Sequence, residues 1–385
     1  MKRKLGEICR IVSGSTPNTG IPEYWGGNLK WVTPAELDDK SRAINDTKRT
    51  ITGLGATKTG LTPLPAGTVL LSSRAPIGKV AITGCEMYCN QGFKNLICSD
   101  SINNKYLYWF LKGKTRYLNS LGRGATFKEI SKKIVADIEI NLPDIEEQEK
   151  IVNRIGKIDS RLFMLRAEIS RLDELIKARF VEMFGDFDLA PQCNEWIKLS
   201  KLGEIVSGST PKTGTAEYWD GDICWITPAE LNSMSGIVYD SKKKITEAGR
   251  NSCSLRLMPI NTVILSSRAP IGKVAILGKE MCCNQGFKNI ICNEKILPKY
   301  LYYLLAYNTD YLNSLGRGAT FKEISKKIVE DIRISLPSIE QQAKFITFSE
   351  QVDKSKFTLQ NSIISLMNLW YNINQYVCER MYGEA

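Results

Sequence analysis

Two stretches of the chain carry a heptad pattern of apolar residues, and each predicts a long helix. In the first, apolar residues follow in alternating steps of four and three, which is the spacing of a coiled-coil seam. In the second they recur every seven positions, with Ser349 and Lys356 interrupting the intermediate places. The predicted seam comprises Ile151, Ile155, Ile158, Leu162, Leu165, Ile169, Leu172 and Ile176 in the first stretch and Phe345, Val352, Leu359, Leu366 and Ile373 in the second.

Helix start signals stand before both stretches. Asp144 is followed by carboxylates that suit the positive end of a helix dipole, and Ser338 forms a capping box with Gln341. Each seam needs a partner, so we expect the two helices to pair with each other in antiparallel orientation. Packing of each helix on its own domain, or pairing between two chains, are the alternatives.

Outside these helices the chain reads as a mixture of short strands and short helices. Thr68–Ser72 and Lys79–Thr83 are expected to form a hairpin, with a type I turn at 75–78. Further predicted elements are helices at Asn104–Lys112 and Phe127–Ala136 and a strand at Ile138–Leu142. These elements predict a mixed α/β domain.

The whole pattern occurs twice. Tyr117–Val135 returns letter for letter at Tyr311–Val329, 194 residues later. Other motifs keep the same offset: SGSTP (13–17 and 207–211), EYW (23–25 and 217–219), TPAEL (33–37 and 227–231), SSRAPIGKVAI (72–82 and 266–276) and NQGFKN (90–95 and 284–289). We therefore expect two similar domains at 1–143 and 188–337, and long helices at 144–187 and 338–385. Divergence is widest at 38–71 and 232–265.

The identical run contains a candidate anion site. Gly122, Arg123 and Gly124 lead into a Thr126-x-x-Glu129 capping box, which predicts a helix that begins at Thr126. A glycine loop at a helix N-terminus, with Arg123 and Lys128 beside it, suits a phosphate. The alternative is a glycine turn that carries solvated charges.

Charge and composition agree with a polyanionic partner. Lys and Arg number 52 against 41 Asp and Glu, a net charge of +11, and the excess lies in the two repeated domains rather than in the helices. No apolar run approaches the length of a membrane span, and no signal peptide is recognisable, so the cytoplasm is the expected location. The chain has eleven cysteines and no histidine. Buried reduced thiols are therefore expected rather than a zinc site.

Several further side chains are candidates for DNA contact. Arg74 and Lys79 flank the predicted hairpin tip, where an arginine can read guanine, and Asn90 with Gln91 can pair with adenine or bond the backbone. An ordinary exposed hairpin is the alternative for the first pair. With the anion site, the candidates are Arg74, Lys79, Asn90, Gln91, Gly122, Arg123, Gly124, Thr126 and Lys128, and in the second copy Arg268, Lys273, Asn284, Gln285, Gly316, Arg317, Gly318, Thr320 and Lys322.

Other features bear on the same hypothesis. The tryptophans at 25, 31, 219 and 225 suit a core better than base stacking. The divergent stretches are the natural place for differing base contacts, unless they are tolerant surface loops. A first helix of about 55 Å, at 1.5 Å per residue, would hold the domains one turn of B-DNA or somewhat more apart.

Catalytic signatures are missing from the sequence. It has no G-x4-G-K-[S/T] loop, no histidine that could act as a base, and no Asn/Asp-Pro-Pro-Tyr/Phe run of the adenine methyltransferases. We therefore expect no enzyme activity and no metal in this chain. A scaffold that does not touch DNA remains the competing class.

These motifs resemble the specificity subunits of type I restriction-modification enzymes. The resemblance rests on the SGSTP, EYW and TPAEL series, on SSRAPIGKVAI, and on the Leu-Pro entry into each long helix (142–148 and 336–342). It implies an α+β fold with two target-recognition domains, related by a pseudo-two-fold axis and joined by an antiparallel coiled coil. Each domain would read one half of a bipartite site in double-stranded DNA.

The resemblance also implies partners. Two adenine methyltransferase subunits would use S-adenosylmethionine, restriction and translocase subunits would use ATP and magnesium, and this chain would hold no cofactor. A methyltransferase arrangement without a nuclease is the alternative. The two domains here are unusually alike, which predicts similar half-sites and a near-palindromic target. Alternatively, the shared residues are scaffold and the stretch at 38–71 gives the first domain a specificity of its own.

Overall fold

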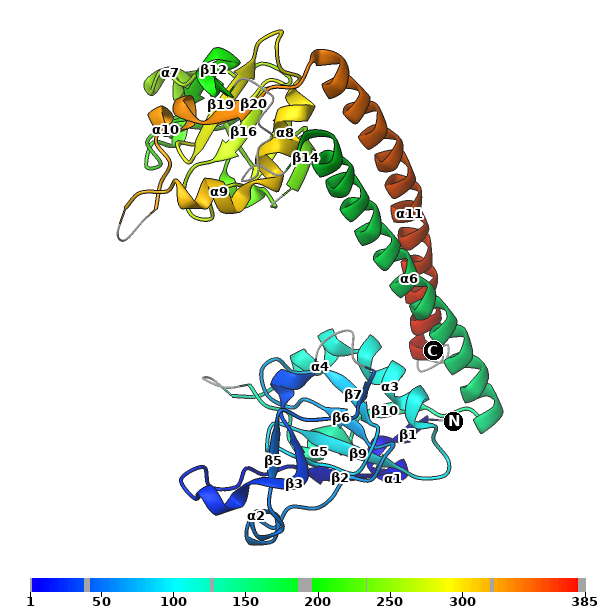
Figure 1. Ribbon diagram of the computed structural model, residues 1–385. Helices are drawn as coiled ribbons and strands as arrows, with labels where there is room; N and C mark the ends of the chain where they lie inside the picture. Colours follow the sequence, from blue (N-terminus) through cyan, green and yellow to red (C-terminus); the bar gives the residue numbers. More distant parts are fainter. Residues whose placement is uncertain are drawn as a thin grey trace. The chain divides into compact units, whose positions relative to one another are not determined.

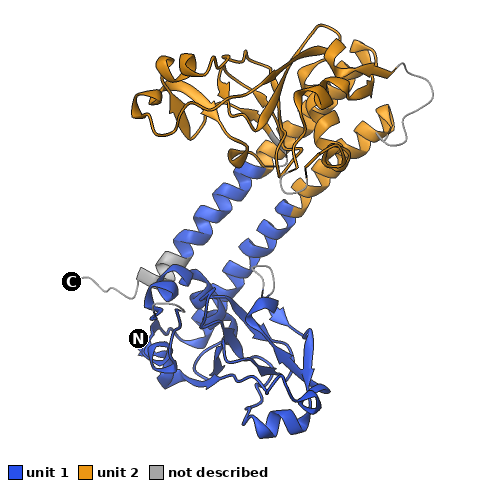
Figure 2. Cartoon of the chain, turned by 90° about the vertical axis from the view of Figure 1, so that its left-hand side faces the viewer, with its two compact units in different colours: residues 1–166, 360–385 blue, residues 167–359 orange. Residues whose placement is uncertain are grey.

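The computed structural model describes residues 2–37, 42–124, 128–185, 196–232, 234–318 and 322–379, without the side chains of Met234, Ser235 and 374–379. The chain divides into two compact units, residues 1–166 with 360–385 and residues 167–359 (Figure 2). Each unit contains one copy of the repeat and a part of both long helices. No helix among the described residues is long and apolar enough to cross a membrane.

The first copy is built on one five-stranded sheet and two smaller sheets. The five-stranded sheet has the order β2 (Cys9–Ser13), β9 (Lys94–Cys98), β6 (Val69–Leu71), β7 (Val80–Thr83), β4 (Ala43–Ile44). The three-stranded sheet has the order β5 (Arg49–Ile51), β3 (Trp25–Val32), β8 (Tyr88–Cys89), and β1 (Lys2–Lys4) pairs with β10 (Glu139–Asn141). The helices are α1 (Leu5–Ile8), α2 (Gly53–Lys58), α3 (Asn104–Gly113), α4 (Thr115–Leu121) and α5 (Lys132–Ala136) (Figure 1).

The second copy repeats this order of elements. Its five-stranded sheet runs β12 (Gly203–Ser207), β19 (Phe287–Cys292), β16 (Val263–Ser266), β17 (Val274–Leu277), β14 (Met234–Val238). Its smaller sheets are β15 (Lys243–Ile245), β13 (Trp219–Ile226), β18 (Cys282–Cys283) and the pair β11 (Trp196–Lys198) with β20 (Arg333–Ser335). The helices are α7 (Glu247–Ser252), α8 (Pro298–Tyr307), α9 (Thr309–Ser314) and α10 (Lys326–Asp331). The predicted pair of similar α/β domains is confirmed.

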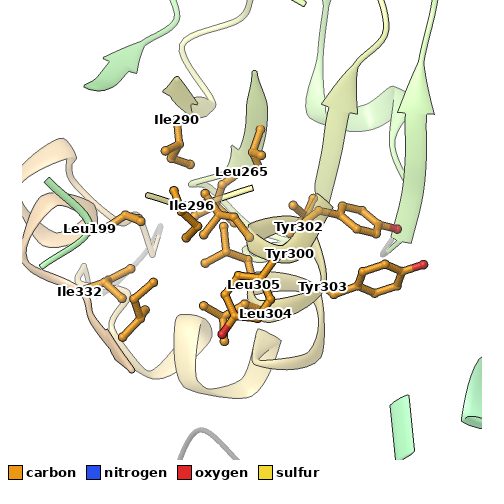
Figure 3. Close-up of a cluster of buried hydrophobic side chains, with 14 of the residues drawn as sticks. Leu199, Leu265, Ile290, Ile296, Tyr300, Tyr302, Tyr303, Leu304, Leu305 and Ile332 are labelled. Carbon is orange, nitrogen blue, oxygen red and sulfur yellow. The ribbon is translucent and has the colours of Figure 1, made fainter. Parts of the chain in front are cut away.

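Both faces of the large sheet are buried, which explains why its central strand reads as a continuous apolar run. In β6, Val69 and Leu71 belong to the cluster under α3, whereas Leu70 belongs to a cluster on the other face. The second copy is built in the same way. Figure 3 shows its α8 side, where Tyr300 and Leu304 lie in the cluster with Leu265 and Ile290 of the sheet.

The two predicted long helices are present as α6 (Ile145–Phe184) and α11 (Ile339–Glu379). Their start signals act as expected, because Asp144 accepts a hydrogen bond from the Glu147 amide (2.8 Å) and Ser338 accepts one from the Gln341 amide (3.3 Å). The glutamine of each entry motif has its own structural reason. Gln148 is fully buried and bonds the backbone at 101, 103 and 143, which ties α6 to its domain. Gln342 does the same for α11.

Within each unit the two helices run antiparallel, as predicted. In the second unit Phe180 packs on Phe345, with ring centroids 5.2 Å apart, and Asp173 pairs with Lys356. The contact nearer the start of α6, at Asp173, is thus made by the residue further along α11, which is the order expected of antiparallel helices. In the first unit Trp370 and Ile373 pack on the cluster that contains Ile155. The ion pair also explains how a lysine fits into the heptad pattern.

The predicted seam is the inner side of these helices. Seven of its residues are buried, and the others are half-buried. The buried ones are Ile155, Ile158, Leu162, Leu165, Ile176, Phe345 and Val352, and the half-buried ones are Ile151, Ile169, Leu172, Leu359, Leu366 and Ile373.

The predicted helix start at Thr126 is wrong. Helix α5 begins at Lys132, where Ser131 accepts the cap hydrogen bond from the Ile134 amide (3.2 Å). Glu129 does not serve as the box glutamate because its backbone bridges to Arg123 and its side chain is held by Arg74 and Lys94. Ser325 and Lys326 stand in the same places in the second copy. Thr126 and Thr320 themselves lie outside the described residues.

The predicted hairpin is confirmed, but its type I turn is wrong. Strands β6 and β7 pair antiparallel, and they are joined by a longer loop in which the Ala75–Pro76 peptide is cis. The Gly78 amide donates to the Ser72 carbonyl (3.0 Å), whereas a turn at 75–78 would direct it to Ala75. The predicted helix at Asn104–Lys112 and strand at Ile138–Leu142 correspond to α3 and β10.

Candidate nucleic-acid interface

Two loops of the first copy lie side by side and form one surface. We call this the two-loop surface, and it comprises residues 73–78, 122–124 and 128–130. The backbone of Glu129 bridges Arg123 on one side and Arg74 on the other. The Ile130 amide then donates to the Ser73 carbonyl (2.9 Å). Residues some fifty positions apart along the chain are thereby held in a fixed order across the surface.

The carboxylate of Glu129 holds the surface together. Its Oε2 pairs with Arg74 Nε and its Oε1 with Lys94 Nζ, each at 3.0 Å. Lys94 comes from β9 beneath the loops, and its side chain is only 9% exposed. Partial burial raises the pKa of Glu129, but the hydrogen bonds and charges of Lys94 and Arg74 outweigh this and leave the pKa below its usual value.

The second copy repeats the arrangement with little change. Glu323 pairs with Arg268 at 3.1 Å and with Lys288 at 3.4 Å, and its backbone bridges Arg317 and Arg268. Burial lowers the pKa of Lys288. The side chains of Lys94 and Lys288 are about equally buried. Each domain therefore has a buried lysine that pairs with the glutamate of the same loop.

Two predicted contacts remain available to a ligand in each copy. Arg123 and Lys128 are exposed, and neither forms an ion pair with any described residue. The anion site cannot rest on a helix N-terminus, since α5 begins only after Ser131. What remains is an exposed arginine and lysine on a loop whose backbone is fixed by Glu129. Arg317 and Lys322 are likewise exposed and without an ion pair among the described residues.

Two glycines lie in this loop, and the second has a backbone reason. A Cβ at Gly122 would come within 2.8 Å of Ile77 Cδ1, the flexible end of that side chain, so a larger residue there would only require Ile77 to shift. Gly124 has φ +124°, a conformation that side chains rarely adopt. Gly316 and Gly318 have the same surroundings and φ in the second copy. The identical run is therefore explained in part by backbone geometry.

Lys79 does not lie free at a hairpin tip. Its Nζ donates to the Leu37 carbonyl (2.6 Å), and Lys273 donates to Leu231 in the same way (2.6 Å). Each lysine thus anchors the end of the TPAEL motif, immediately before a divergent stretch. Arg74 differs, because only its Nε is engaged by Glu129 and its side chain is 48% exposed.

Asn90 and Gln91 bond within the protein. Asn90 accepts from the Gly92 amide (2.6 Å) and donates to Thr16 Oγ1 (3.3 Å), while Gln91 Oε1 accepts from the Thr16 hydroxyl. Asn284 and Gln285 make the same bonds to Thr210. These contacts join the SGSTP and NQG loops, which is the structural alternative considered for them. The Ser73 amide donates to the Gly92 carbonyl (2.7 Å), so both loops adjoin the two-loop surface.

One aromatic pair lies at the small sheet. Trp31 is buried and Trp25 half-buried, with ring centroids 5.0 Å apart and nearly perpendicular. Arg49, from the divergent stretch, places its guanidinium carbon 3.7 Å from the Trp25 ring centroid. In the second copy Lys243 takes this position, 5.5 Å from Trp219. The same framework thus presents two different cations.

Sequence reasoning missed Glu129 and Lys94 as organisers of the surface. Both lie in motifs that recur unchanged, which was the available signal. Their partnership was not visible because they are 35 residues apart and belong to a loop and a strand.

The chain is thus built from two copies of one domain, and each copy carries exposed cations on a loop that the same glutamate fixes. The match to a family model agrees. Residues 1–172 and 192–368 both match the type I restriction modification DNA specificity domain, and the chain belongs to this family.

Curated relatives carry the corresponding names. The chain is 37% identical over 204 residues to the MjaIX specificity subunit of Methanocaldococcus jannaschii, covering 51% of this chain and 47% of that protein. It is 30% identical over 176 residues to the EcoR124I/EcoR124II specificity subunit of Escherichia coli, covering 44% of this chain and 42% of that protein. The aligned region spans about half the length of each of these relatives.

Solved structures share the fold over nearly the whole chain. A chain from a study of assembly and conformational transition of the type I restriction-modification system aligns with a TM-score of 0.64 and 19% identity, covering 98% of this chain and 97% of that one. The S subunit of the type I system from M. genitalium aligns with a TM-score of 0.57 and 17% identity, over 98% and 95%.

Proposed function

We propose that this chain is the DNA-reading subunit of a type I restriction-modification complex, and that each domain reads one half of a bipartite site. The observation that carries the proposal is the two-loop surface, present in both copies with the same buried lysine, the same glutamate and the same exposed cations. In this role Arg123 and Lys128, with Arg317 and Lys322, hold phosphates of the DNA backbone. Identity between the copies suits such contacts, because phosphates carry no sequence information.

Base discrimination lies elsewhere in this proposal. The divergent stretches begin at the backbone that Lys79 and Lys273 anchor, so each starts from a fixed point beside the two-loop surface. Arg49 and Lys243 lie within them at matched positions. An arginine can bond guanine with two donors, whereas lysine offers a single ammonium. The domains then share a framework and differ in what they read, although similar half-sites remain the expectation from their overall likeness.

The chain acts without chemistry of its own in this proposal. Two adenine methyltransferase subunits and the restriction and translocase subunits would assemble on it, and S-adenosylmethionine, ATP and magnesium would bind to those partners. The chain would act on DNA in the cytoplasm. The methyltransferase arrangement without a nuclease fits the same features.

A salt titration of DNA binding tests the proposal. The full chain, together with its methyltransferase partner, is titrated against duplex DNA in a gel shift at increasing salt. A reader loses affinity linearly on a log–log scale, with a slope of about −0.9 per phosphate contacted. Absence of DNA binding at low salt would leave the scaffold interpretation standing.

Methylome sequencing of cells that carry the complex tests the bipartite reading. Two short half-sites separated by unspecific bases are expected, and they should resemble each other. Two unrelated half-sites would disprove the near-palindromic target while leaving the two-domain reader intact. A single continuous site would contradict both.

A further inference from the structure

A cavity of about 800 Å³ opens in the first copy between α3, the edge of the large sheet and α6. Its buried wall is formed by Tyr108 and Trp109 of α3, which are 2% and 5% exposed. Its exposed lining includes Arg42, Lys105, Lys157 and Arg161. The volume falls in the range of small-molecule sites, and neither the two-loop surface nor the Trp25–Trp31 pair contributes to it.

The polar groups of this cavity are incompletely used within the protein. Trp109 is almost wholly buried, yet its indole N–H has no hydrogen-bond partner among the described residues. Lys105, Lys157 and Arg161 form no ion pair within the described part of the chain. The indole nitrogen is not one of the fully buried polar atoms that lack a partner among the described residues, so water reaches it, and an acceptor on a ligand in the cavity would replace that water.

Arg42 adds a flat surface. Its guanidinium carbon lies 5.7 Å from the centroid of the Trp109 ring, and its charge is balanced by Asp159 of α6. A guanidinium held in this way stacks well against planar rings. A flat ligand that lies on Arg42 would therefore lie next to Trp109.

The second copy differs at these positions, although its framework is the same. The residues 194 positions on from Arg42, Gly156, Lys157 and Arg161 are Gly236, Glu350, Gln351 and Ser355. Three of the cations are thereby lost and one carboxylate is gained.

The lysine that remains in the second copy is engaged. Lys299, the counterpart of Lys105, pairs with Glu350 and Asp353 at 3.6 and 3.3 Å. Tyr302, the counterpart of Tyr108, accepts a hydrogen bond from the Gly236 amide (3.2 Å). Figure 3 shows Tyr302 and Tyr303 extending in the same direction from α8. The features of the first copy are therefore not needed to build the fold.

We propose that the cavity of the first copy binds a nucleotide, with its base against Arg42 and the Tyr108–Trp109 wall and its phosphates at Lys105, Lys157 and Arg161. The aromatic wall and the Arg42 guanidinium favour a ligand with a planar ring over a plain anion. Only one such site would exist per chain, which would make the two halves of the protein unequal. None of the individual residues proposed above as DNA contacts lines this cavity, although Arg42 belongs to the first divergent stretch, so the nucleotide site is tested separately from DNA binding.

Calorimetry on the full chain tests the proposal with ATP as the probe. We expect one site per chain, and at least ten-fold weaker binding of adenosine and of inorganic tripolyphosphate, each of which presents half of the ligand chemistry. Equal affinity for tripolyphosphate would mean that a basic surface merely attracts anions, and no heat with ATP would overturn the site. Binding of an acidic peptide in place of ATP would assign the cavity to a protein partner and also overturn it.

The variant Gly156→Glu places the second copy's residue in the cavity. A Cβ at Gly156 meets nothing within 4 Å, so the helix accepts the substitution without strain. We expect it to weaken ATP binding at least ten-fold and to leave DNA affinity unchanged. Lys58→Ala, which removes an exposed charge from α2, is the matched control and should change ATP affinity less than two-fold. Unchanged ATP affinity in Gly156→Glu would place the nucleotide elsewhere and contradict the proposal.

Discussion

Lys94 and Glu129 meet at 3.0 Å beneath the two-loop surface, one from a buried strand and the other from a loop. Because the Lys94 side chain is almost inaccessible to solvent, Glu129 supplies the negative charge that balances it. The same glutamate holds Arg74 on the outside. This ion pair therefore fixes the conformation of the two-loop surface, even though its loop carries two glycines.

Removing the charge of Glu129 should destabilise the two-loop surface. In Glu129→Gln the buried Lys94 loses its counter-ion, at an expected cost of about 2 kcal/mol. The Ile130 amide, which donates to the Ser73 carbonyl (2.9 Å), reports this junction. Its protection in hydrogen exchange should fall roughly thirty-fold. Arg74→Gln, which breaks only the exposed pair, should cost less than about 1 kcal/mol; equal effects of the two variants would refute the role of the buried lysine.

The same pair predicts a pH dependence. The pKa of Glu129 is lowered in the folded protein, so its ion pairs contribute stability above the unfolded pKa of about 4.3, and this contribution is lost as pH falls through the folded value. Protection of the Ile130 amide, corrected for intrinsic exchange, should be constant above about pH 5 and decline below about pH 4. The decline should be absent in Glu129→Gln. A decline of the same size in that variant would assign it to other carboxylates.

Arg123 and Lys79 should respond differently to mutation, although both are cations of the same region. Replacing Arg123 and Arg317 together by Ala should weaken binding to every DNA sequence alike and reduce the salt slope by about 2, one for each domain. Stability should not change, because both side chains are exposed. Binding isotherms at several salt concentrations measure this, and a slope equal to that of the wild type would exclude these arginines as phosphate contacts.

Lys79→Met serves as the control for this comparison. It removes the hydrogen bond to the Leu37 carbonyl, so it should destabilise the start of the divergent stretch by about 1–3 kcal/mol. The salt slope should remain that of the wild type. A reduced slope in Lys79→Met would restore the lysine as a DNA contact.

The long helices and the repeat could be predicted because both are periodic in the sequence. A heptad pattern and a fixed offset of 194 need no knowledge of the fold. The helix start at Thr126 failed for the opposite reason. The predicted capping box is a local signal that uses the Glu129 carboxylate. In the structure this carboxylate pairs instead with Lys94, 35 residues upstream. The cavity beside α3 was equally hidden, because its lining brings Gly156 together with residues far away in the sequence, and the second copy has a glutamate in place of this glycine.

The antiparallel pairing in the second unit predicts one specific crosslink. Asp173 and Lys356 form an ion pair, so cysteines at these two positions should be joined by a short bifunctional thiol reagent and be recovered as one linked peptide pair by mass spectrometry. Cysteines at Asp173 and Lys354, two residues away on the helix surface, should link much less efficiently. Parallel helices would place these positions far apart, and no linked peptide would then be recovered.

Arg49 and Lys243 offer a direct test of where sequence is read. Arg49 lies 3.7 Å from the Trp25 ring centroid, whereas Lys243 lies at 5.5 Å from Trp219. If these cations read bases, Arg49→Lys should reduce discrimination at one position of one half-site, by about 1–3 kcal/mol between the correct and a wrong base pair. Lys243→Arg should change the other half-site only. Competition binding with single-base variants of the methylome-defined site measures both effects. Because neither residue belongs to the two-loop surface, the salt slope should not change by more than one contact. An equal loss of affinity for all single-base DNA variants would show that these residues hold phosphate instead.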